Sequence, residues 1–454
     1  MKTEAQLTVL LYDWLGACCA SKTGLNATLK TDTAVPSTHP RAVVVLALAL
    51  AVSPACTPSE SPDSPVKINP EPLAHHEITL ATLPAPFATK SVSNPPRVIP
   101  RPSGAQLNLP PGFEISVYAE GGFEEPRWMA LAPNGDVFLA DSGAGAVFIL
   151  RDTLGKGVAD TRFTFETGLN RPFGMVFWRD YFYVANTDSV VRFRYRPGQT
   201  ESEDFPQKIL DLPARGYNAH WTRNIIFNPD GSKMVVTVGS GTNVDVESDP
   251  LRGTISEYNP DGTGHQFVAQ GTRNPVGLAF NPTTGKLWAA VEERDGLRDD
   301  LPPDYLVEVE DGGFYGWPFA YMGPHEDPRH KGQRPDLVAR SIVPDVMFQA
   351  HSAILGLVFY DGTMFPEEYR GDAFVAMHGS WNRSKLTGYK IARVRFKDGR
   401  PVGGYDGFVT GWMLNDDSLD VWGRPAGLLV LKDGSMLIAD DGGRRIWRVS
   451  YQNR

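Results

Sequence analysis

Residues 273–318 read RNPVGLAFNPTTGKLWAAVEERDGLRDDLPPDYLVEVEDGGFYGWP. Two apolar segments, 276–280 and 286–290, flank a polar turn and predict a short β-hairpin. An acidic loop follows, and its six acids are Glu292, Glu293, Asp295, Asp299, Asp300 and Asp304. The hairpin therefore brings a cation, Arg273, to one end and carboxylates to the other. This arrangement is typical of a functional site rather than of a strand pair that only fills a core.

The same strand–turn–strand pattern recurs after about residue 107. Its six copies occupy residues 128–152, 174–195, 224–240, 277–295, 356–380 and 427–449. Four copies carry Asn-Gly or Asp-Gly turns, which are strong hairpin signals. No window shows a convincing helical period. The sequence therefore predicts an all-β, six-bladed β-propeller, and a β-sandwich or barrel is the weaker alternative. Longer gaps precede the fifth and sixth copies, so we expect insertions on a functional face there.

Composition narrows the class of protein. The chain has 454 residues, of which 41% are hydrophobic and 21% charged, as in globular proteins. The net charge is −9 and there is no long basic run, so nucleic acid is not an expected partner. The three cysteines, Cys18, Cys19 and Cys56, all precede the repeats, so the propeller has neither disulfides nor a thiolate metal site.

The N-terminal hundred residues have a different character. Residues 41–56, RAVVVLALALAVSPAC, resemble a secretory signal that ends in a bacterial lipobox, with Cys56 as the lipidated residue. An ordinary signal peptide and a short membrane anchor are the alternatives. Because the apolar run begins late, we interpret residues 1–34 as the result of a translation start site assigned too early. We expect a Pro/Ser-rich linker at 57–106, the catalytic propeller at 107–454, and a periplasmic or outer-surface location in the bacterial cell envelope.

Several polar residues stand just ahead of repeat strands: His220, Arg273, His351 and Arg424. Equivalent positions in propeller blades share a face, so their side chains are predicted to converge at one end of the central channel. His220 can act as a general base near neutral pH, and Arg273 can clamp a carboxylate. The plainer interpretations are a structural histidine that bonds a carbonyl and a surface arginine.

The acidic loop suits calcium, although its spacing is not that of an EF-hand. A solvated loop balanced by Arg294 and Arg298 is the alternative. There is no GxGxxG between a strand and a helix, no Walker motif, no HExxH and no plausible GxSxG elbow, so nucleotide cofactors are disfavoured.

Four segments together resemble the soluble quinoprotein sugar dehydrogenases, which bind pyrroloquinoline quinone (PQQ) on a six-bladed propeller. These segments are LPPGFEISVYAEG at 109–121, the stretch around His220, TRNPVGLAF at 272–280 and GGFYGWP at 312–318. The ERDGLRDDLPPDYL loop and the HGSWNRSKLTGYK segment are most similar to the sorbosone-dehydrogenase-like branch. The resemblance covers roughly residues 107–451.

The resemblance implies a mechanism in which a histidine takes the proton of the anomeric hydroxyl while hydride passes to the quinone. On this reading His220 is the base, and Arg273 acts with it. The implied cofactor contacts are His220, Arg273, Asn274, Ser352, Arg383 or Lys385, and Arg424. Ca²⁺ would be held by the backbone carbonyls of Arg294 and Asp295, with Asp304 close by.

The chain departs from the family at two places. The best-known members have Gly-Pro where Arg294-Asp295 stands, and an aspartate after the third repeat orients their histidine. Here Val238-Gly239-Ser240 occupies that position, and Asp245 or Glu247 could substitute.

These observations together predict a PQQ- and Ca²⁺-dependent dehydrogenase that oxidises a sugar or sugar-derived aldehyde or hemiacetal. Its electrons would pass to an external acceptor, since the chain has no CxxCH haem site. Membrane contact is expected only through lipid at Cys56. A calcium-dependent, lactonase-like propeller hydrolase and a non-catalytic binding propeller are the alternative functions.

Overall fold

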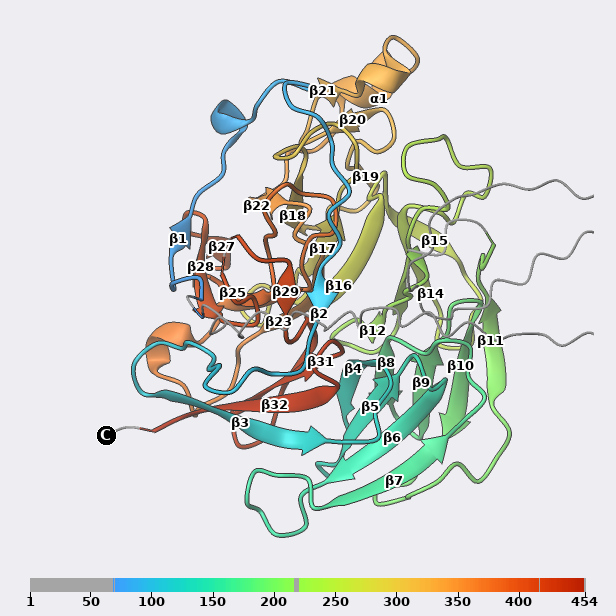
Figure 1. Ribbon diagram of the computed structural model, residues 1–454. Helices are drawn as coiled ribbons and strands as arrows, with labels where there is room; N and C mark the ends of the chain where they lie inside the picture. The colour runs from blue at the N-terminus through green and yellow to red at the C-terminus, as the bar shows by residue number, and fades with distance from the viewer. Residues whose placement is uncertain (1–67, 69, 216–219, 416, 453–454) are drawn as a thin grey trace, which may run out of the picture. The chain divides into compact units, whose positions relative to one another are not determined.

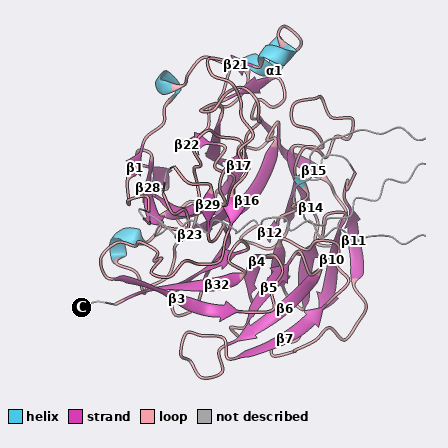
Figure 2. Ribbon diagram, viewed as in Figure 1, coloured by secondary structure: helices cyan, strands magenta, loops and turns pink. Residues whose placement is uncertain are grey.

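The computed structural model describes residues 68, 70–215, 220–415 and 417–452, all of which belong to the compact unit Asp63–Arg454. The predicted signal and lipoprotein segment, 1–56, lies outside them. Strands dominate the described residues, and the single α-helix among them, α1, covers only Pro335–Ala339 (Figure 2). None of their helices is long and apolar enough to cross a membrane.

Six antiparallel sheets form the blades, which confirms the predicted six-bladed β-propeller (Figure 1). Blade one contains β4 (Pro126–Leu131), β5 (Val137–Asp141), β6 (Ala146–Arg151) and β7 (Thr161–Glu166). Blade two contains β8 (Met175–Trp178), β9 (Tyr181–Ala185), β10 (Ser189–Arg194) and β11 (Gln207–Asp211). Blade three contains β12 (Ile225–Phe227), β13 (Met234–Val238), β14 (Thr254–Tyr258) and β15 (Gln266–Gln270), with β19 (Gly313–Phe314) parallel at its edge.

Blades four to six continue the ring. Blade four contains β16 (Asn274–Phe280), β17 (Leu287–Glu292), β18 (Pro303–Glu308) and β22 (Val346–Ala350). Blade five contains β23 (Ile354–Phe359), β24 (Ala373–Met377), β25 (Lys390–Val394) and β28 (Tyr405–Val409). Blade six contains β30 (Pro425–Val430), β31 (Met436–Asp440), β32 (Arg445–Tyr451) and β3 (Phe113–Glu120). Short two-stranded sheets pair β20 (Ala320–Tyr321) with β21 (His325–Glu326), and β26 (Phe396–Lys397) with β27 (Arg400–Pro401).

The innermost strands close around one axis. Each of β4, β8, β12, β16, β23 and β30 contacts the innermost strand of the next blade, and β30 contacts β4. This approach leaves no space for side chains at some positions. A Cβ on Gly277 would lie 2.8 Å from the Leu355 carbonyl oxygen, and one on Gly356 would lie 2.3 Å from that of Ala426. Glycine at these positions is therefore required by close approach of neighbouring backbones.

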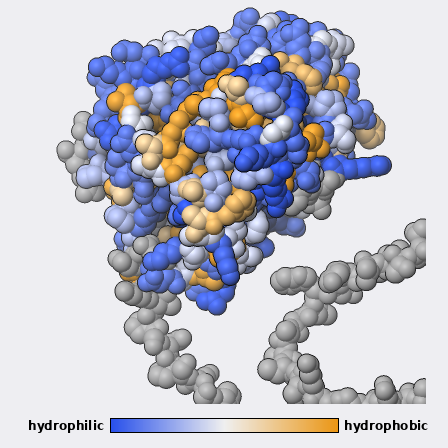
Figure 3. Space-filling view, turned by 90° about the horizontal axis from the view of Figure 1, so that it is seen from above, coloured by the Kyte–Doolittle hydropathy of each residue, from blue (hydrophilic) through white to orange (hydrophobic). Residues whose placement is uncertain are grey.

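The ring is closed by a strand from before the first blade. β3 pairs antiparallel with β32 along its whole length, and the two lie side by side in Figure 1. Blade six thus combines the beginning and the end of the propeller, so that closing the ring leaves no unpaired strand between blades six and one. The surface seen from above is mainly hydrophilic, with hydrophobic residues in separate patches (Figure 3).

Residues 70–106 form an ordered strap along the propeller. β1 (His75–His76) pairs with β28 at the edge of blade five, and β2 (Arg97–Val98) pairs with β29 (Asp420–Val421). Glu71 accepts a 2.6 Å bond from Lys390, whose side chain is 1% exposed. Residues 70–106 of the predicted Pro/Ser-rich linker, 57–106, thus pair with strands of the propeller at two places. A Pro- and Ser-rich segment cannot form a core of its own. Strand β28 and Lys390 of blade five instead supply its hydrogen-bond partners.

Candidate active site

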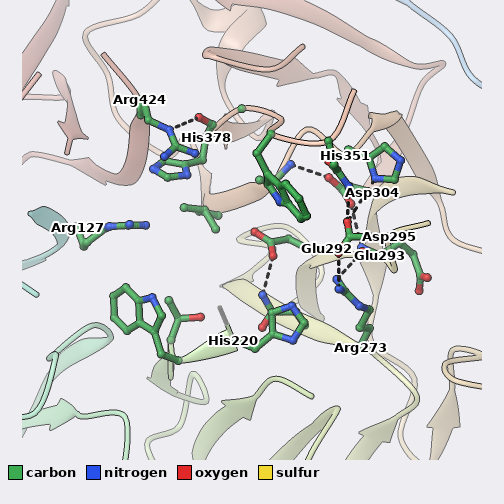
Figure 4. Close-up of a pocket in the computed structure, with 18 residues that line it drawn as sticks. Arg127, His220, Arg273, Glu292, Glu293, Asp295, Asp304, His351, His378 and Arg424 are labelled. Atoms are coloured by element: carbon green, nitrogen blue, oxygen red, sulfur yellow. Dashed lines mark hydrogen bonds and ion pairs between the residues drawn. The ribbon is translucent and has the colours of Figure 1, made fainter. Parts of the chain in front are cut away.

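The segments that lead into the innermost strands surround a pocket of about 270 Å³. Blades one, three, four, five and six contribute to it. Its lining includes His220, Arg273, His351 and Arg424, so the structure brings the four residues predicted to converge to a single cavity (Figure 4). This volume lies near the lower end of the roughly 300–1,000 Å³ of small-molecule sites.

His220 is buried at the entrance to β12 and is fixed by Ser240. The Nδ1 atom of His220 lies 2.8 Å from the Ser240 hydroxyl oxygen and 3.1 Å from the Ser240 carbonyl oxygen. The Ser240 hydroxyl itself donates to the Thr242 carbonyl at 2.6 Å, so both groups near Nδ1 act as acceptors. Nδ1 therefore carries the proton, and Nε2 is the nitrogen with a lone pair.

The electrostatic surroundings keep His220 neutral. Burial lowers the pKa of His220 well below its usual value, and the nearby Arg273 guanidinium lowers it further. Ser240 thus fills the place for which Asp245 or Glu247 was considered from the sequence. Glu247 instead accepts backbone bonds from Gly241 and Thr242. A neutral imidazole with a fixed tautomer is suited to accept a proton.

Arg273 is held by several acceptors at the start of blade four. Its guanidinium bonds the Glu293 carbonyl at 2.5 Å, the Asn243 side-chain oxygen at 2.9 Å and the Asp295 carboxylate at 2.9 Å. The neighbouring Asn274 donates to Glu292 at 2.7 Å. This network fixes a buried positive charge beside His220.

Three buried acids line the wall around Arg273. Burial raises the pKa of Glu293 to about 7, and it also raises the pKa of Glu292. Burial raises the pKa of Asp304 well above its usual range. Asp304 accepts bonds from the backbone N–H groups of Glu293 (2.9 Å) and Ala353 (2.7 Å). Its role is therefore to join the acidic loop to the entrance of blade five.

Two of the three predicted calcium ligands, Asp295 and Asp304, are already bonded within the protein. The Asp295 carbonyl accepts bonds from Asn243 at 3.0 Å and from the Arg294 guanidinium at 3.1 and 2.9 Å, and the Asp304 carboxylate is used as described above. The Arg294 side chain is 1% exposed and pairs with Asp327. Within the described ranges, no cluster of three or more His, Cys, Asp or Glu residues could hold a metal ion. Nitrogen donors therefore already bond the Asp295 carbonyl and the Asp304 carboxylate, and the assignment of Arg294, Asp295 and Asp304 to calcium stays a prediction.

The entrance to blade five has an unusual backbone. His351 and Ala353 have φ angles of 64° and 53°, in the left-handed region that costs energy for residues other than glycine. Asp304 holds this turn through Ala353. Ser352, which the resemblance placed on the cofactor, is fully buried and donates to the Gln349 carbonyl at 2.6 Å. The structure therefore places His351 on the pocket and turns Ser352 away from it.

The segment after β24 also reaches the pocket, but through other residues than predicted. Arg383 pairs with Asp300, and Lys385 lies 3.5 Å from Asp417 with a side chain that is 67% exposed. Neither lines the cavity, so their assignment as cofactor contacts is not supported by position. Trp381 and Asn382 line it instead, and Asn94 of the strap bonds the Trp381 carbonyl at 2.7 Å.

Sequence reasoning pointed to the His378 segment but missed its partners on the opposite wall of the pocket, Asp441 and Arg127. His378 Nε2 lies 2.9–3.0 Å from both carboxylate oxygens of Asp441, and Asp441 lies 2.7 Å from Arg127. Arg127 is the second residue of β4, the innermost strand of blade one. The repeat pattern contained this signal, since residue 127 immediately precedes the first copy. Asp441 follows β31 and carried no such signal.

Besides Arg127 Nε, which forms an ion pair with Asp441, four buried polar atoms of the pocket have no hydrogen-bond partner among the described residues. They are Thr222 Oγ1, Asn274 Oδ1, Glu293 Oε1 and Asn382 Oδ1. An unpaired buried polar atom costs about 1–3 kcal/mol. Three of these atoms are acceptor oxygens, so their concentration in one cavity indicates a polar ligand that brings hydrogen-bond donors, while Arg424 offers a cation beside them.

Residues 123–402 match the sequence profile of the glucose/sorbosone dehydrogenase family. The chain belongs to this family. An uncharacterized protein of Borreliella burgdorferi is 29% identical over 76% of this chain and 91% of its own length. Two solved structures share the fold. The calcium structure of the Trichoderma reesei family AA12 enzyme has a TM-score of 0.67 at 19% identity, covering 78% of this chain and 98% of its own. The holo PQQ domain of Coprinopsis cinerea pyranose dehydrogenase has a TM-score of 0.65 at 18% identity, covering 77% and 98%.

Proposed function

We propose that this family member is a PQQ-dependent oxidoreductase that oxidises the hemiacetal of a sugar or sugar-derived aldehyde. The observation that carries the proposal is His220, a buried neutral imidazole whose Nδ1 is fixed by Ser240, beside the buried Arg273. Relatives in this family include a PQQ-dependent pyranose dehydrogenase of Coprinopsis cinerea, and the PQQ-bound aldose sugar dehydrogenase of Streptomyces coelicolor shares the fold.

The lining residues fit this cofactor. PQQ carries carboxylates and carbonyl oxygens, and, when bound, it supplies the two-electron acceptor for the reaction. Arg424, whose Nε makes a 3.4 Å contact to the His378 carbonyl, would hold one of its carboxylates. Asn274 and Asn382 present unpaired amide oxygens to polar hydrogens of cofactor or sugar. Trp381, 43% exposed at the rim, offers an apolar face to a sugar ring.

The residues around His220 perform the proton chemistry. Nε2 of His220 takes the proton of the anomeric hydroxyl, while Ser240 keeps the ring oriented. Arg273 stabilises the negative charge that develops beside it during oxidation, because its guanidinium is already fixed by the protein and needs no reorganisation. The calcium-dependent hydrolase is less favoured, since the Asp295 and Asp304 oxygens that it would use for the metal are already bonded to the protein.

The test is to titrate the purified protein with PQQ and record the absorbance spectrum, then measure aldose-dependent reduction of an artificial dye. We expect a saturable spectral shift and dye reduction that requires both PQQ and sugar. A protein that leaves the PQQ spectrum unchanged at micromolar concentration would refute the proposal.

We also propose that the mature protein begins at a lipidated Cys56 and donates electrons to an external acceptor in the cell envelope. The apolar run that ends at this cysteine supports the first part. Intact-mass analysis of envelope material tests it: an N-terminus elsewhere, or the lack of an acyl mass, would contradict it.

A further inference from the structure

A second, larger cavity adjoins the central pocket. It measures about 950 Å³ and shares two lining residues with the pocket, Arg127 and Arg424. Residues 98–101 of the strap and residues 441–445 between β31 and β32 form its walls, with Glu124, Glu125 and Gly143 from blade one. Most of these walls lie outside residues 123–402, so they are features of this chain rather than of the matched family region. We call this cavity the side groove.

The side groove is richer in cations than in carboxylates. Its arginines are Arg101, Arg127, Arg424, Arg444 and Arg445, and its acids are Glu124, Glu125 and Asp441. The five arginines outnumber the three acids, and Arg127 pairs with two of these acids, Glu125 at 2.8 Å and Asp441 at 2.7 Å. Among the described residues, Arg444 has neither a hydrogen-bond partner nor an ion pair. The groove is thus positive although the chain carries a net charge of −9.

Hydrogen bonds of the Asp440 carboxylate fix the backbone near two arginines of the side groove, Arg424 and Arg444. The Asp440 carboxylate accepts the backbone N–H groups of Arg424 and Gly443, each at 2.7 Å, and the indole N–H groups of Trp412 and Trp447. Arg444 follows directly, with a left-handed φ of 51°. A strained non-glycine residue on an over-determined loop marks a functional position. The backbone positions of Arg424 and Arg444 are therefore fixed relative to each other, and Arg424 lies where the pocket meets the side groove.

We propose that the side groove binds an anionic sugar unit attached to the sugar that is oxidised in the central pocket. The substrate class is then a reducing oligosaccharide whose second unit carries a carboxylate, with Arg444 as its principal contact. This inference rests on the proposed function. The reducing unit enters between His220 and Trp381, and the next unit extends past Arg424 into the groove, where charge-assisted hydrogen bonds recognise its carboxylate.

The test compares kcat/KM for a reducing disaccharide that ends in a uronic acid with kcat/KM for its neutral counterpart. We expect the acidic disaccharide to be preferred about tenfold or more, the usual worth of one charge-assisted contact. In Arg444→Gln the preference should fall to near one, with the neutral disaccharide unaffected. Arg370→Gln, an exposed arginine at the end of a short 3-10 helix on blade five, is the matched control and should keep the preference. Added salt should weaken the preference.

Equilibrium binding of the acidic disaccharide, measured by calorimetry, separates this inference from the proposed function. Binding that depends on Arg444 without any oxidation would overturn the proposed function and, with it, the link to an oxidised sugar, and would leave only the recognition of the carboxylate by Arg444. Oxidation with equal kcat/KM for both disaccharides, or a preference that survives in Arg444→Gln, would overturn the inference alone. A sulfated analogue that matches the uronate would show that the groove recognises negative charge rather than a carboxylate, and would overturn the assignment to uronic acids.

Discussion

Two buried histidines face the same pocket from opposite walls, and their partners differ. His220 is fixed by the hydroxyl and carbonyl of Ser240, both of which lie near Nδ1. His378 bonds both oxygens of Asp441, which also pairs with Arg127. Burial lowers the pKa of both, and that of His378 falls to about 3.

Because their partners differ, the His220 wall and the His378 wall are expected to have different roles. The hydrogen-bonding capacity of the His378 wall is used within the protein, since Asp441, His378 and Arg127 satisfy one another. The His220 wall retains unpaired atoms at Thr222 and Asn274. Capacity that the protein leaves unused is available to ligands, so the chemistry belongs to the His220 wall and the other wall positions Arg424.

The largest expected effect is on turnover, and it separates the two histidines. His220→Asn should lower kcat by about 10²–10⁴-fold, the usual worth of a positioned general base, while PQQ still binds. His378→Asn should instead lower the free energy of unfolding by about 1–3 kcal/mol, because Asp441 loses a buried partner. Steady-state kinetics and denaturant unfolding of both variants measure the contrast. A larger kcat loss in His378→Asn would reverse the assignment of the walls.

Arg273→Ala should damage both binding and turnover. It removes a fixed positive charge from the His220 wall, and the expected loss of transition-state stabilisation is about 2–4 kcal/mol. Arg273→Lys retains the charge without the forked contacts to Asn243 and Asp295 and should recover only part of the loss. The measurements are the PQQ dissociation constant and kcat/KM. Normal PQQ affinity in Arg273→Ala would show that this arginine has a structural role.

The pH profile sharpens the role of Ser240. The base works in its neutral form, and its pKa is lowered, so kcat/KM should stay level as the pH falls through 6.5. Ser240→Asp places a carboxylate beside Nδ1 and should raise the pKa of His220, so that activity is lost nearer to neutral pH. Ser240→Asn, which adds no charge, is the control. An unchanged profile in Ser240→Asp would mean that His220 does not set the acid limb.

Calcium removal should have the smallest effect. The Asp295 carbonyl and the Asp304 carboxylate are occupied by nitrogen donors, so a chelator should leave PQQ affinity unchanged within error. Spectral titration before and after exhaustive chelation measures this. A fall in affinity of tenfold or more that added Ca²⁺ restores would show that a metal binds through other atoms of the pocket.

The sequence predicted the propeller because each blade repeats a local pattern, and it predicted the pocket because blade entrances share one face. What it could not predict depends on contacts between distant residues. The direction of the Arg294 side chain, toward Asp327 and the Asp295 carbonyl of its own loop, could not be predicted from the sequence. Ser240 was recognised only as a departure from the family, since a hydroxyl that orients a histidine has no distinctive spacing. The closure by β3 and the packing of the strap likewise depend on partners hundreds of residues away.

The most direct test of the central claim is the rate at which an aldose reduces protein-bound PQQ in a single turnover, followed by stopped-flow absorbance in wild-type protein, His220→Asn and His378→Asn. We expect all three proteins to bind PQQ, and we expect only His220→Asn to reduce it at least about 10²-fold more slowly. Reduction at the wild-type rate in His220→Asn would contradict it.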